Sequence, residues 1–163
     1  MGSRERVTEF LATTGAGYEV REFDESTKNS ALAAKALGCS AAEIAKSVVF
    51  VGTKTAVVIA SGDRRVSIHK LSKVVGEVRM ARPEEVREKT GFPIGGVPPF
   101  PHQAGVTVLP DASLNRFDMV WAAAGAPNAV FRMSSLDIVR LVGVDPFDLC
   151  EPPGASHGEG QAR

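Results

Sequence analysis

The spacing of apolar residues along the first part of the chain predicts helices. Apolar side chains recur three and four positions apart over residues 4–14, which favours an amphipathic helix. The Ala-rich segment 30–37 predicts a second helix, and Gly38 is placed to end it. Residues 40–43 (SAAE) have the spacing of a capping box, which predicts a short helix that carries Ile44.

Beyond this point the pattern changes to runs of β-branched residues, which favour strands. Residues 47–51 and 55–60 are separated by only a short turn at 52–54, so they predict a β-hairpin that is buried on both faces. Further short strands are expected near residues 18–23, 66–68, 78–81, 106–109, 119–123 and 128–133.

Two later helices carry clear end signals. Pro83 at a first helical position, with acidic residues after it, predicts a helix that ends at Gly91. The serine pair at 134–135 predicts the start of a final amphipathic helix that carries Leu136 and Leu141. Because helices and strands interleave and several strands are joined by hairpin-length links, we expect an α/β fold with a mixed, α+β-like sheet.

The length limits the number of domains. A chain of 163 residues fits one domain, and a folded chain of about 150 residues buries roughly 70% of its unfolded surface. We therefore expect a compact single domain over residues 1–150. The segment 151–163 has no core-forming residues and is expected to be a disordered C-terminal tail.

Charge and apolar content exclude several classes of protein. Nineteen Lys and Arg residues balance nineteen Asp and Glu residues, which disfavours general coating of duplex DNA, and no specific DNA partner is expected. The sequence has no apolar run close to the roughly 20 residues of a membrane span. Its N-terminus lacks the apolar segment of a secretory signal. The expected location is the cytoplasm.

Cysteine and histidine spacing favours neither a metal nor a cofactor. Cys39 and Cys150 form no CxxC pair, so two free thiols are expected. His69, His102 and His157 have no metal-ligand spacing, and the first two are expected at the surface or in loops. Walker A, GxGxxG, GxSxG and HExxH motifs are absent.

Two features depart from this ordinary pattern. Residues 90–100 (TGFPIGGVPPF) combine paired glycines with prolines, which suits a stiff loop that aims backbone N–H groups at a carbonyl oxygen or a phosphate. A rigid connection between strands explains the same composition. Lys46 precedes a very apolar strand, where it either extends outward to water or points into a cleft and binds a phosphate or a carbonyl.

With these features the sequence resembles the YbaK/ProX family of free-standing aminoacyl-tRNA editing domains, which are related to the insertion domain of bacterial prolyl-tRNA synthetase. The resemblance covers roughly residues 5–146, and the block TGFPIGGVPP at 90–99 is its most specific part. The other matching blocks are LG at 37–38, KSVVF at 46–50, GDRR at 62–65, DASL at 111–114 and AGAPNA at 124–129.

The resemblance implies a trans-editing deacylase, which hydrolyses the ester between a wrong amino acid and the terminal adenosine of a tRNA. It implies a curved mixed sheet flanked by helices, and no metal. The family's essential lysine corresponds to Lys46. Its GxxxP loop corresponds to Gly95, Gly96, Val97, Pro98 and Pro99, of which the first three can supply amide donors for an oxyanion while the two prolines line the substrate site. The absence of an obvious general base favours catalysis assisted by the substrate itself.

Three departures from the family pattern concern the amino-acid pocket. Asn29 stands where members often carry Thr, with Thr27 and Ser30 nearby. Phe23 corresponds to a tyrosine, and Val130 to an acidic residue, of the members that edit Cys-tRNA. We therefore expect a pocket less polar than theirs, and Cys-, Ala-, Ser- and Thr-tRNA are all open as substrates.

The expected partner is the acceptor end of a mischarged tRNA, with Arg64, Arg65 and Lys70 as candidate contacts. Balanced charge predicts modest tRNA affinity or reliance on an aminoacyl-tRNA synthetase for that affinity. Two other functions fit the sequence. One is a non-catalytic nucleic-acid-binding or regulatory module, and the other is a protein that binds a small metabolite in the same cleft.

Overall fold

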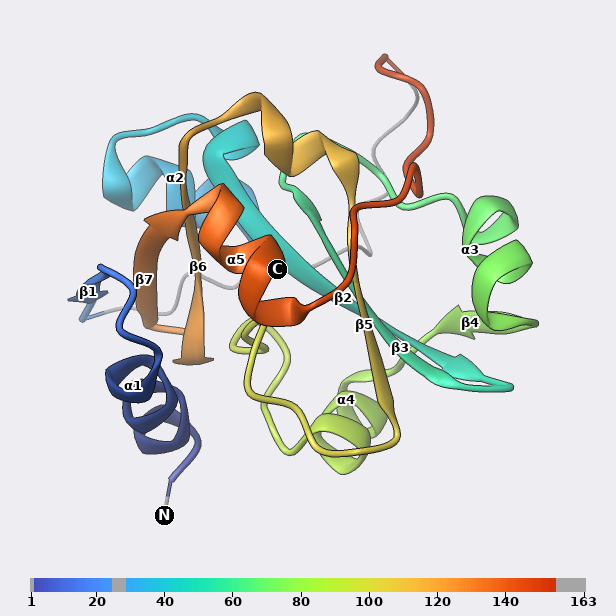
Figure 1. Ribbon diagram of the computed structural model, residues 1–163, viewed down its shortest axis with the longest axis horizontal. Helices are drawn as coiled ribbons and strands as arrows, with labels where there is room; N and C mark the ends of the chain where they lie inside the picture. The colour runs from blue at the N-terminus through green and yellow to red at the C-terminus, as the bar shows by residue number, and fades with distance from the viewer. Residues whose placement is uncertain (1, 25–28, 155–163) are drawn as a thin grey trace.

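A mixed sheet organises the chain in the computed structural model, which describes residues 2–24 and 29–154 (Figure 1). Its strands follow the order β1-β7-β6-β2-β3-β5, and β4 also pairs with β2. The β2–β6 and β3–β5 pairs are parallel and the others are antiparallel, so the predicted mixed sheet is confirmed. The strands are β1 Glu19–Glu22, β2 Ile44–Gly52, β3 Thr55–Ser61, β4 Val78–Met80, β5 Val106–Pro110, β6 Met119–Ala126 and β7 Ala129–Ser134.

Helices cover both faces of this sheet. Apolar residues of α1, α4 and α5 belong to one core cluster, and this side of the sheet is called the α1 face below. Helices α2 and α3 pack on the opposite side, the α2 face. The α-helices are α1 Ser3–Thr14, α2 Ser30–Leu37, α3 Ile68–Val75, α4 Pro83–Thr90 and α5 Ser135–Val142, and two 3-10 turns are η1 Ala41–Glu43 and η2 Ala112–Arg116.

The hairpin of β2 and β3 forms the middle of the sheet, as the two β-branched runs predicted. Successive side chains of a strand point to opposite faces. In β2, Val49 and Val51 belong to the cluster on the α1 face, whereas Val48 and Phe50 belong to a cluster on the α2 face. Both sets are buried, because helices lie on both sides. The continuous apolar run in the sequence therefore corresponds to a strand with two buried faces.

The structure corrects three details of the sequence prediction. Ile68, expected in a short strand at 66–68, begins α3, and Val66 forms an isolated β-bridge rather than a strand. The capping box at Ser40 forms, but η1 lasts a single turn and Ile44 already pairs with Trp121 as the first residue of β2. In α5, Leu136 is 74% exposed, while Ile138 is fully buried. The helix is rotated so that Ile138 rather than Leu136 packs on the sheet.

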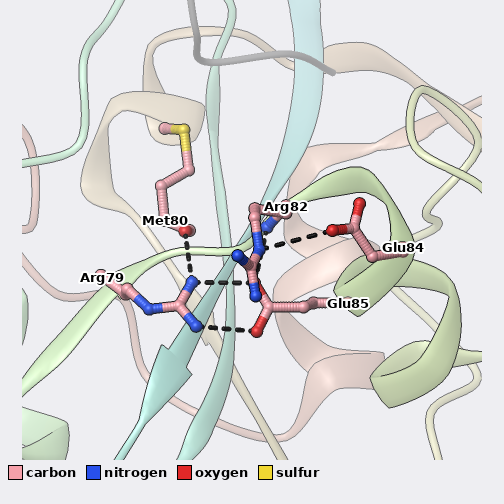
Figure 2. A network of polar contacts seen from close by, with 5 residues as sticks. All are labelled: Arg79, Met80, Arg82, Glu84 and Glu85. Atoms are coloured by element: carbon pink, nitrogen blue, oxygen red, sulfur yellow. Dashed lines mark hydrogen bonds and ion pairs between the residues drawn. The ribbon is translucent and has the colours of Figure 1, made fainter.

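Short polar contacts fix α4 against β4 (Figure 2). The Arg79 guanidinium donates two hydrogen bonds of 2.8 Å to the Glu85 carboxylate, which also accepts the Arg82 backbone N–H at 3.0 Å. These contacts, led by the hydrogen bond from Arg79, lower the pKa of Glu85 to about 2. The helix begins at Pro83 and ends at Gly91, as predicted.

The chain beyond α5 belongs to the fold at least as far as Cys150. Asp111 forms a β-bridge with Phe147, and Val66 forms one with Cys150. Most of the predicted C-terminal tail, residues 155–163, lies outside the described residues. None of the helices within residues 2–24 and 29–154 is long and apolar enough to cross a membrane.

The α1-face core predicts a specific pattern of stability. Phe131 is fully buried there, with its ring centroid 5.8 Å from that of Phe100. Phe131→Ala should lower the free energy of unfolding by about 3–5 kcal/mol, because it leaves a cavity. Leu136→Ala, on the exposed side of α5, should change it by less than about 0.5 kcal/mol. Urea denaturation of both variants tests this, and a large effect of Leu136→Ala would contradict the orientation of α5.

Candidate active site

The sheet is interrupted along one edge of β2. Strand β3 pairs with the whole of one edge, from Ala45 to Phe50. On the other edge, β6 pairs only with Ile44 and Ala45, and β4 pairs from Phe50 onward. Within the part of the chain that the structure describes, Lys46, Ser47 and Val48 therefore have no strand partner on this edge. We call this interval the β2 gap.

The glycine–proline loop lies across the β2 gap on the α1 face. Ile94 lines a small hollow together with Ser47 and Val48. At the other side of the gap, a Cβ on Gly96 would lie only 2.8 Å from the Cα of Ala126, at the end of β6. Only glycine permits this approach of the loop to β6. The loop thus fills the space where a strand would otherwise pair with β2.

Side chains on both sides hold the loop in place. The Nε2–H of His102 donates to the Pro98 carbonyl at 2.8 Å, and its ring meets Phe92 edge-on with centroids 5.7 Å apart. Arg6 donates to the Gly91 carbonyl at 2.7 Å and stacks over Phe92. Burial lowers the pKa of His102, against the hydrogen bond to Pro98, which raises it. The loop position predicted for His102 is confirmed.

The loop uses one of its glycine amides internally. The Gly96 N–H donates to the Pro93 carbonyl at 2.9 Å, and Gly95 has a φ of 82°, which is the geometry of a tight turn that needs glycine at this position. Among the described residues, the N–H groups of Gly95 and Val97 have no hydrogen-bond partner. Two of the three predicted amide donors are therefore free, and Gly96 instead permits close packing. Residues 95–99 are buried.

Lys46 is buried on the opposite side of the gap, with 4% of its surface exposed. It shares the α2 face with Val48 and Phe50, by the alternation of β2. Its ammonium has no hydrogen bond or ion pair with any described residue. Burial lowers the pKa of Lys46, and Arg65 acts in the same direction, against the opposing influence of Cys150 and Asp63. An unpaired buried lysine is costly, which favours a role in binding a ligand.

Three residues near Lys46 were not singled out as site residues from the sequence. Asp111 accepts the N–H groups of Leu149 and Ser113, at 2.8 and 2.9 Å. Burial and the adjacent Asp111 raise the pKa of the Cys150 thiol. Asp63 is fixed by two hydrogen bonds from Arg116, at 3.1 and 2.7 Å. The blocks at 62–65 and 111–114 carried a signal for Asp63 and Asp111, whereas nothing in the sequence pointed to Cys150.

The predicted pocket residues gather on the α2 face. Phe23, Val130 and Trp121 form one cluster with Ala33 and Ala34 of α2. Val130 is fully buried and Phe23 packs at its margin. These residues form a packed apolar cluster, and a pocket less polar than that of the members that edit Cys-tRNA stays a prediction.

The polar candidates at the start of α2 have different roles. Asn29 caps the helix, since its side-chain oxygen accepts the Leu32 N–H at 2.9 Å. Ser30 is buried, and its hydroxyl has no hydrogen-bond partner. Its Oγ faces the backbone turn at Gly62, where a Cβ would come within 2.7 Å of it. Thr27 lies outside the described residues. Ser30 thus holds an unpartnered hydroxyl beside the turn at Gly62.

The basic residues proposed for tRNA contact are engaged with acids. Arg65 lies 3.8 Å from Glu151, and Arg64 lies 3.7 Å from Asp63. Lys70 donates to Asp148 at 3.0 Å and to the Cys150 carbonyl at 2.8 Å, so it holds the C-terminal segment. Within residues 2–24 and 29–154, no group of three His, Cys, Asp or Glu residues is arranged to hold a metal ion. Both cysteines are free thiols.

Comparisons with known proteins agree with this geometry. A model of the aminoacyl-tRNA editing domain family matches residues 24–141. An uncharacterized protein of Bacillus subtilis, YwhH, is 35% identical over 123 residues, which cover 74% of this chain and 78% of that protein.

Solved structures share the fold. One, described provisionally as a trans-editing enzyme for prolyl tRNA synthetase, has 40% identity and a TM-score of 0.83, over 93% of this chain and 99% of that one. Another, of a hypothetical protein, has 30% identity and a TM-score of 0.84, over 90% of this chain and 99% of that one. The family match spans most of the chain and confirms the resemblance drawn from its motifs: the protein belongs to the aminoacyl-tRNA editing domain family.

Proposed function

We propose that the protein is a trans-editing deacylase that hydrolyses the aminoacyl ester of mischarged tRNA without a metal. The observations that carry this proposal are the buried Lys46 on the α2 face of the β2 gap, with no hydrogen bond or ion pair to a described residue, and the loop on its α1 face, where the amides of Gly95 and Val97 are free. Membership of the editing-domain family supports the same reaction class.

In this proposal the substrate enters from the α2 face. The Lys46 ammonium binds the terminal adenosine or the ester carbonyl, because a desolvated cation interacts strongly with such groups. The N–H groups of Gly95 and Val97 donate to the oxyanion that forms when water attacks the ester carbonyl. The hydrogen bonds from His102 and Arg6 to the loop carbonyls hold these donors in place, so little reorganisation is needed as charge develops on the oxyanion.

The proton of the attacking water goes to the substrate rather than to the protein. The carboxylates of Asp63, which acts on Lys46, and of Asp111, which acts on Cys150, are already occupied: Asp63 binds Arg116, and Asp111 binds two backbone N–H groups. We therefore propose that the amino group or a ribose hydroxyl of the substrate assists the water.

Pocket size sets the choice of amino acid. In this proposal the amino acid lies against the apolar cluster of Ala33, Ala34 and Val130, and the unpartnered Ser30 hydroxyl is the polar group offered to it. We propose that Cys, Ala, Ser or Thr enters and that larger amino acids are excluded, which is the second sieve of editing. The reaction is proposed to occur in the cytoplasm, with free tRNA or with a synthetase that supplies the tRNA.

Removal of the Lys46 ammonium should abolish most of the activity. With tRNAs charged with Cys, Ala, Ser or Thr, the wild-type protein should hydrolyse at least one, and Lys46→Ala should reduce that rate by about 10²–10³-fold, as for loss of one oxyanion contact. Loss of radiolabelled aminoacyl-tRNA measures the rate. Lys54→Ala, in the exposed turn between β2 and β3, is the matched control and should keep the wild-type rate.

Two results would contradict the deacylase. One is stable binding of aminoacyl-tRNA with no hydrolysis of any member of the panel, which would favour a non-catalytic nucleic-acid-binding module. The other is full activity of Lys46→Ala, which would leave the buried lysine without the proposed role.

The approach of the loop to β6 is tested at Gly96. In Gly96→Ala the added Cβ meets the backbone of Ala126 and should push the loop out of the β2 gap. We expect a fall of at least about 10-fold in kcat for deacylation, because a shift of about 1 Å in positioned groups costs up to 10²-fold. Gly17→Ala is the control, since nothing lies within 4 Å of its Cβ. Equal kcat values for both variants would show that loop position does not matter.

Burial of Lys46 should lower stability in return for function. Lys46→Met keeps the apolar stem, removes the desolvated charge and should raise the free energy of unfolding by about 0.5–2 kcal/mol while deacylation is lost.

The lowered pKa of Lys46 also makes this difference depend on pH. Just below pH 10.5, the ordinary pKa of lysine in the unfolded chain, the unfolded chain binds more protons than the native state. The free energy of unfolding of the wild-type protein should therefore approach that of Lys46→Met as pH rises toward 10.5. Denaturant titrations across this range measure the difference, and a constant difference would contradict the lowered pKa.

A further inference from the structure

A row of side chains on the α2 face leads from Lys46 to the outer edge of the sheet. Arg21 of β1 pairs with Val130 of β7, and Val130 pairs with Ala123 of β6. Lys46 of β2 follows the Ala45–Ala122 pair and so continues the row on the far side of Ala123. Paired strands are about 4.8 Å apart, and β6 leaves β2 after Ala45, so the backbones of Lys46 and Arg21 are separated by at least roughly 14 Å. In the sheet the row between them consists of Ala123 and Val130, both of which are buried.

The guanidinium groups of Arg21 and Arg132 both lie near the ring of Trp121, at the end of this row. The Cζ of Arg21 lies 5.1 Å from the ring centroid of Trp121, and the Cζ of Arg132 lies 5.9 Å from it. Trp121 is 7% exposed, so its ring position is fixed by the core beneath it. Stacking on a fixed ring orients a guanidinium and leaves its N–H donors available at the edge.

These arginines differ from the other basic residues near the pocket in their bonding. Arg132 forms no hydrogen bond or ion pair with any described residue. Arg21 has one contact of 3.3 Å, between its Nε and Glu19, and both side chains are about half exposed, so this pair contributes little. By contrast, Arg64, Arg65, Lys70 and Arg116 all lie against carboxylates. Of these six residues, only Arg132 and Arg21 keep most of their donors available, and both lie on the outer strands β7 and β1.

We propose that Arg21 and Arg132 form a phosphate-binding pair for the single-stranded 3′ end of the tRNA. This inference rests on the proposed function, because it takes the ester to lie at Lys46. The separation of at least roughly 14 Å exceeds the length of an aminoacyl group, so the pair meets the backbone of the nucleotides that precede the terminal adenosine. Planar guanidiniums with free N–H edges suit phosphate oxygens, and such contacts position a strand without reading its sequence.

The test compares a long and a short substrate. Deacylation of the mischarged tRNA identified by the panel is measured beside hydrolysis of the 3′-aminoacyl-adenosine with the same amino acid, which has no preceding phosphate. In the Arg21→Ala/Arg132→Ala double variant, kcat/KM on tRNA should fall about 10–100-fold, mainly through KM. The rate on aminoacyl-adenosine should stay at the wild-type value. Loss of two single-strand phosphate contacts should also reduce the slope of log kcat/KM against log salt by about 1.4.

Matched variants separate this role from charge and folding. Arg87→Ala/Arg140→Ala removes two exposed arginines from α4 and α5, which lie on the α1 face, and should leave both substrates and the salt slope unchanged. Arg21→Lys/Arg132→Lys keeps the charge but not the planar stack, and should give an intermediate KM. Thermal melts verify folding, and Arg21→Ala alone, at the sheet edge, replaces the double variant if that variant melts early.

The outcomes distinguish the two proposals. If the wild-type protein hydrolyses neither substrate, the deacylase itself is wrong. If it hydrolyses tRNA and the double variant keeps the wild-type KM and salt slope, the phosphate-binding pair is overturned while the deacylase stands. If both substrates lose rate equally in a folded variant, the arginines act on the amino-acid pocket, which also overturns the pair.

Discussion

The candidate site depends on a missing strand contact along β2. A backbone edge inside a sheet normally pairs, since an unpaired buried N–H or C=O costs free energy comparable to a lost hydrogen bond. Here β6 leaves β2 after Ala45, and β4 does not join until Phe50. Among the described residues, the interval between them leaves Lys46, Ser47 and Val48 without a strand partner on this edge, and the loop at 90–102 covers it on the α1 face. Lys46 is the first residue of that interval.

The loop that fills the gap is held in one conformation by its neighbours. The loop at 90–102 crosses it as irregular backbone, yet hydrogen bonds from Arg6 and His102 fix it as firmly as a strand would be fixed. Gly96 allows the loop to touch β6, and the turn at Gly95 directs the neighbouring amides away from internal partners. The fold thus supports a buried charge and free donors at its centre, which conflicts with maximal stability and is typical of functional sites.

The placement of the charged side chains says more about tRNA contact than the net charge does. A net charge of zero suggests a surface with little affinity for nucleic acid. The structure distributes that balance unevenly: the basic residues around 63–70 are paired with carboxylates, whereas Arg132 and the outer edge of Arg21 are not. A few available donors beside the pocket are compatible with brief contact to the end of a tRNA, without the extended basic surface that duplex binding needs.

The sequence by itself determined the elements and the chemistry-bearing motifs. The hairpin, the glycine stops at Gly38 and Gly91 and the alternation of helices with strands follow from local rules, and they appear in the structure as predicted. Lys46 and the loop at 95–99 stood out because their residue types conflict with an ordinary core. Local rules failed where neighbours decided the outcome: Ile44 is a strand residue because Trp121 pairs with it, and Leu136 is exposed because α5 docks through Ile138.

Only the tertiary structure decided how these parts meet. The gap beside Lys46, the close approach of Gly96 to Ala126 and the stacking of Arg21 and Arg132 on Trp121 all join segments that are distant in the chain. Their geometry depends on strand order and register, and local sequence carries no information about which strand lies beside which. For the same reason Cys150, far from every motif, could not be placed next to Lys46 until the chain was folded.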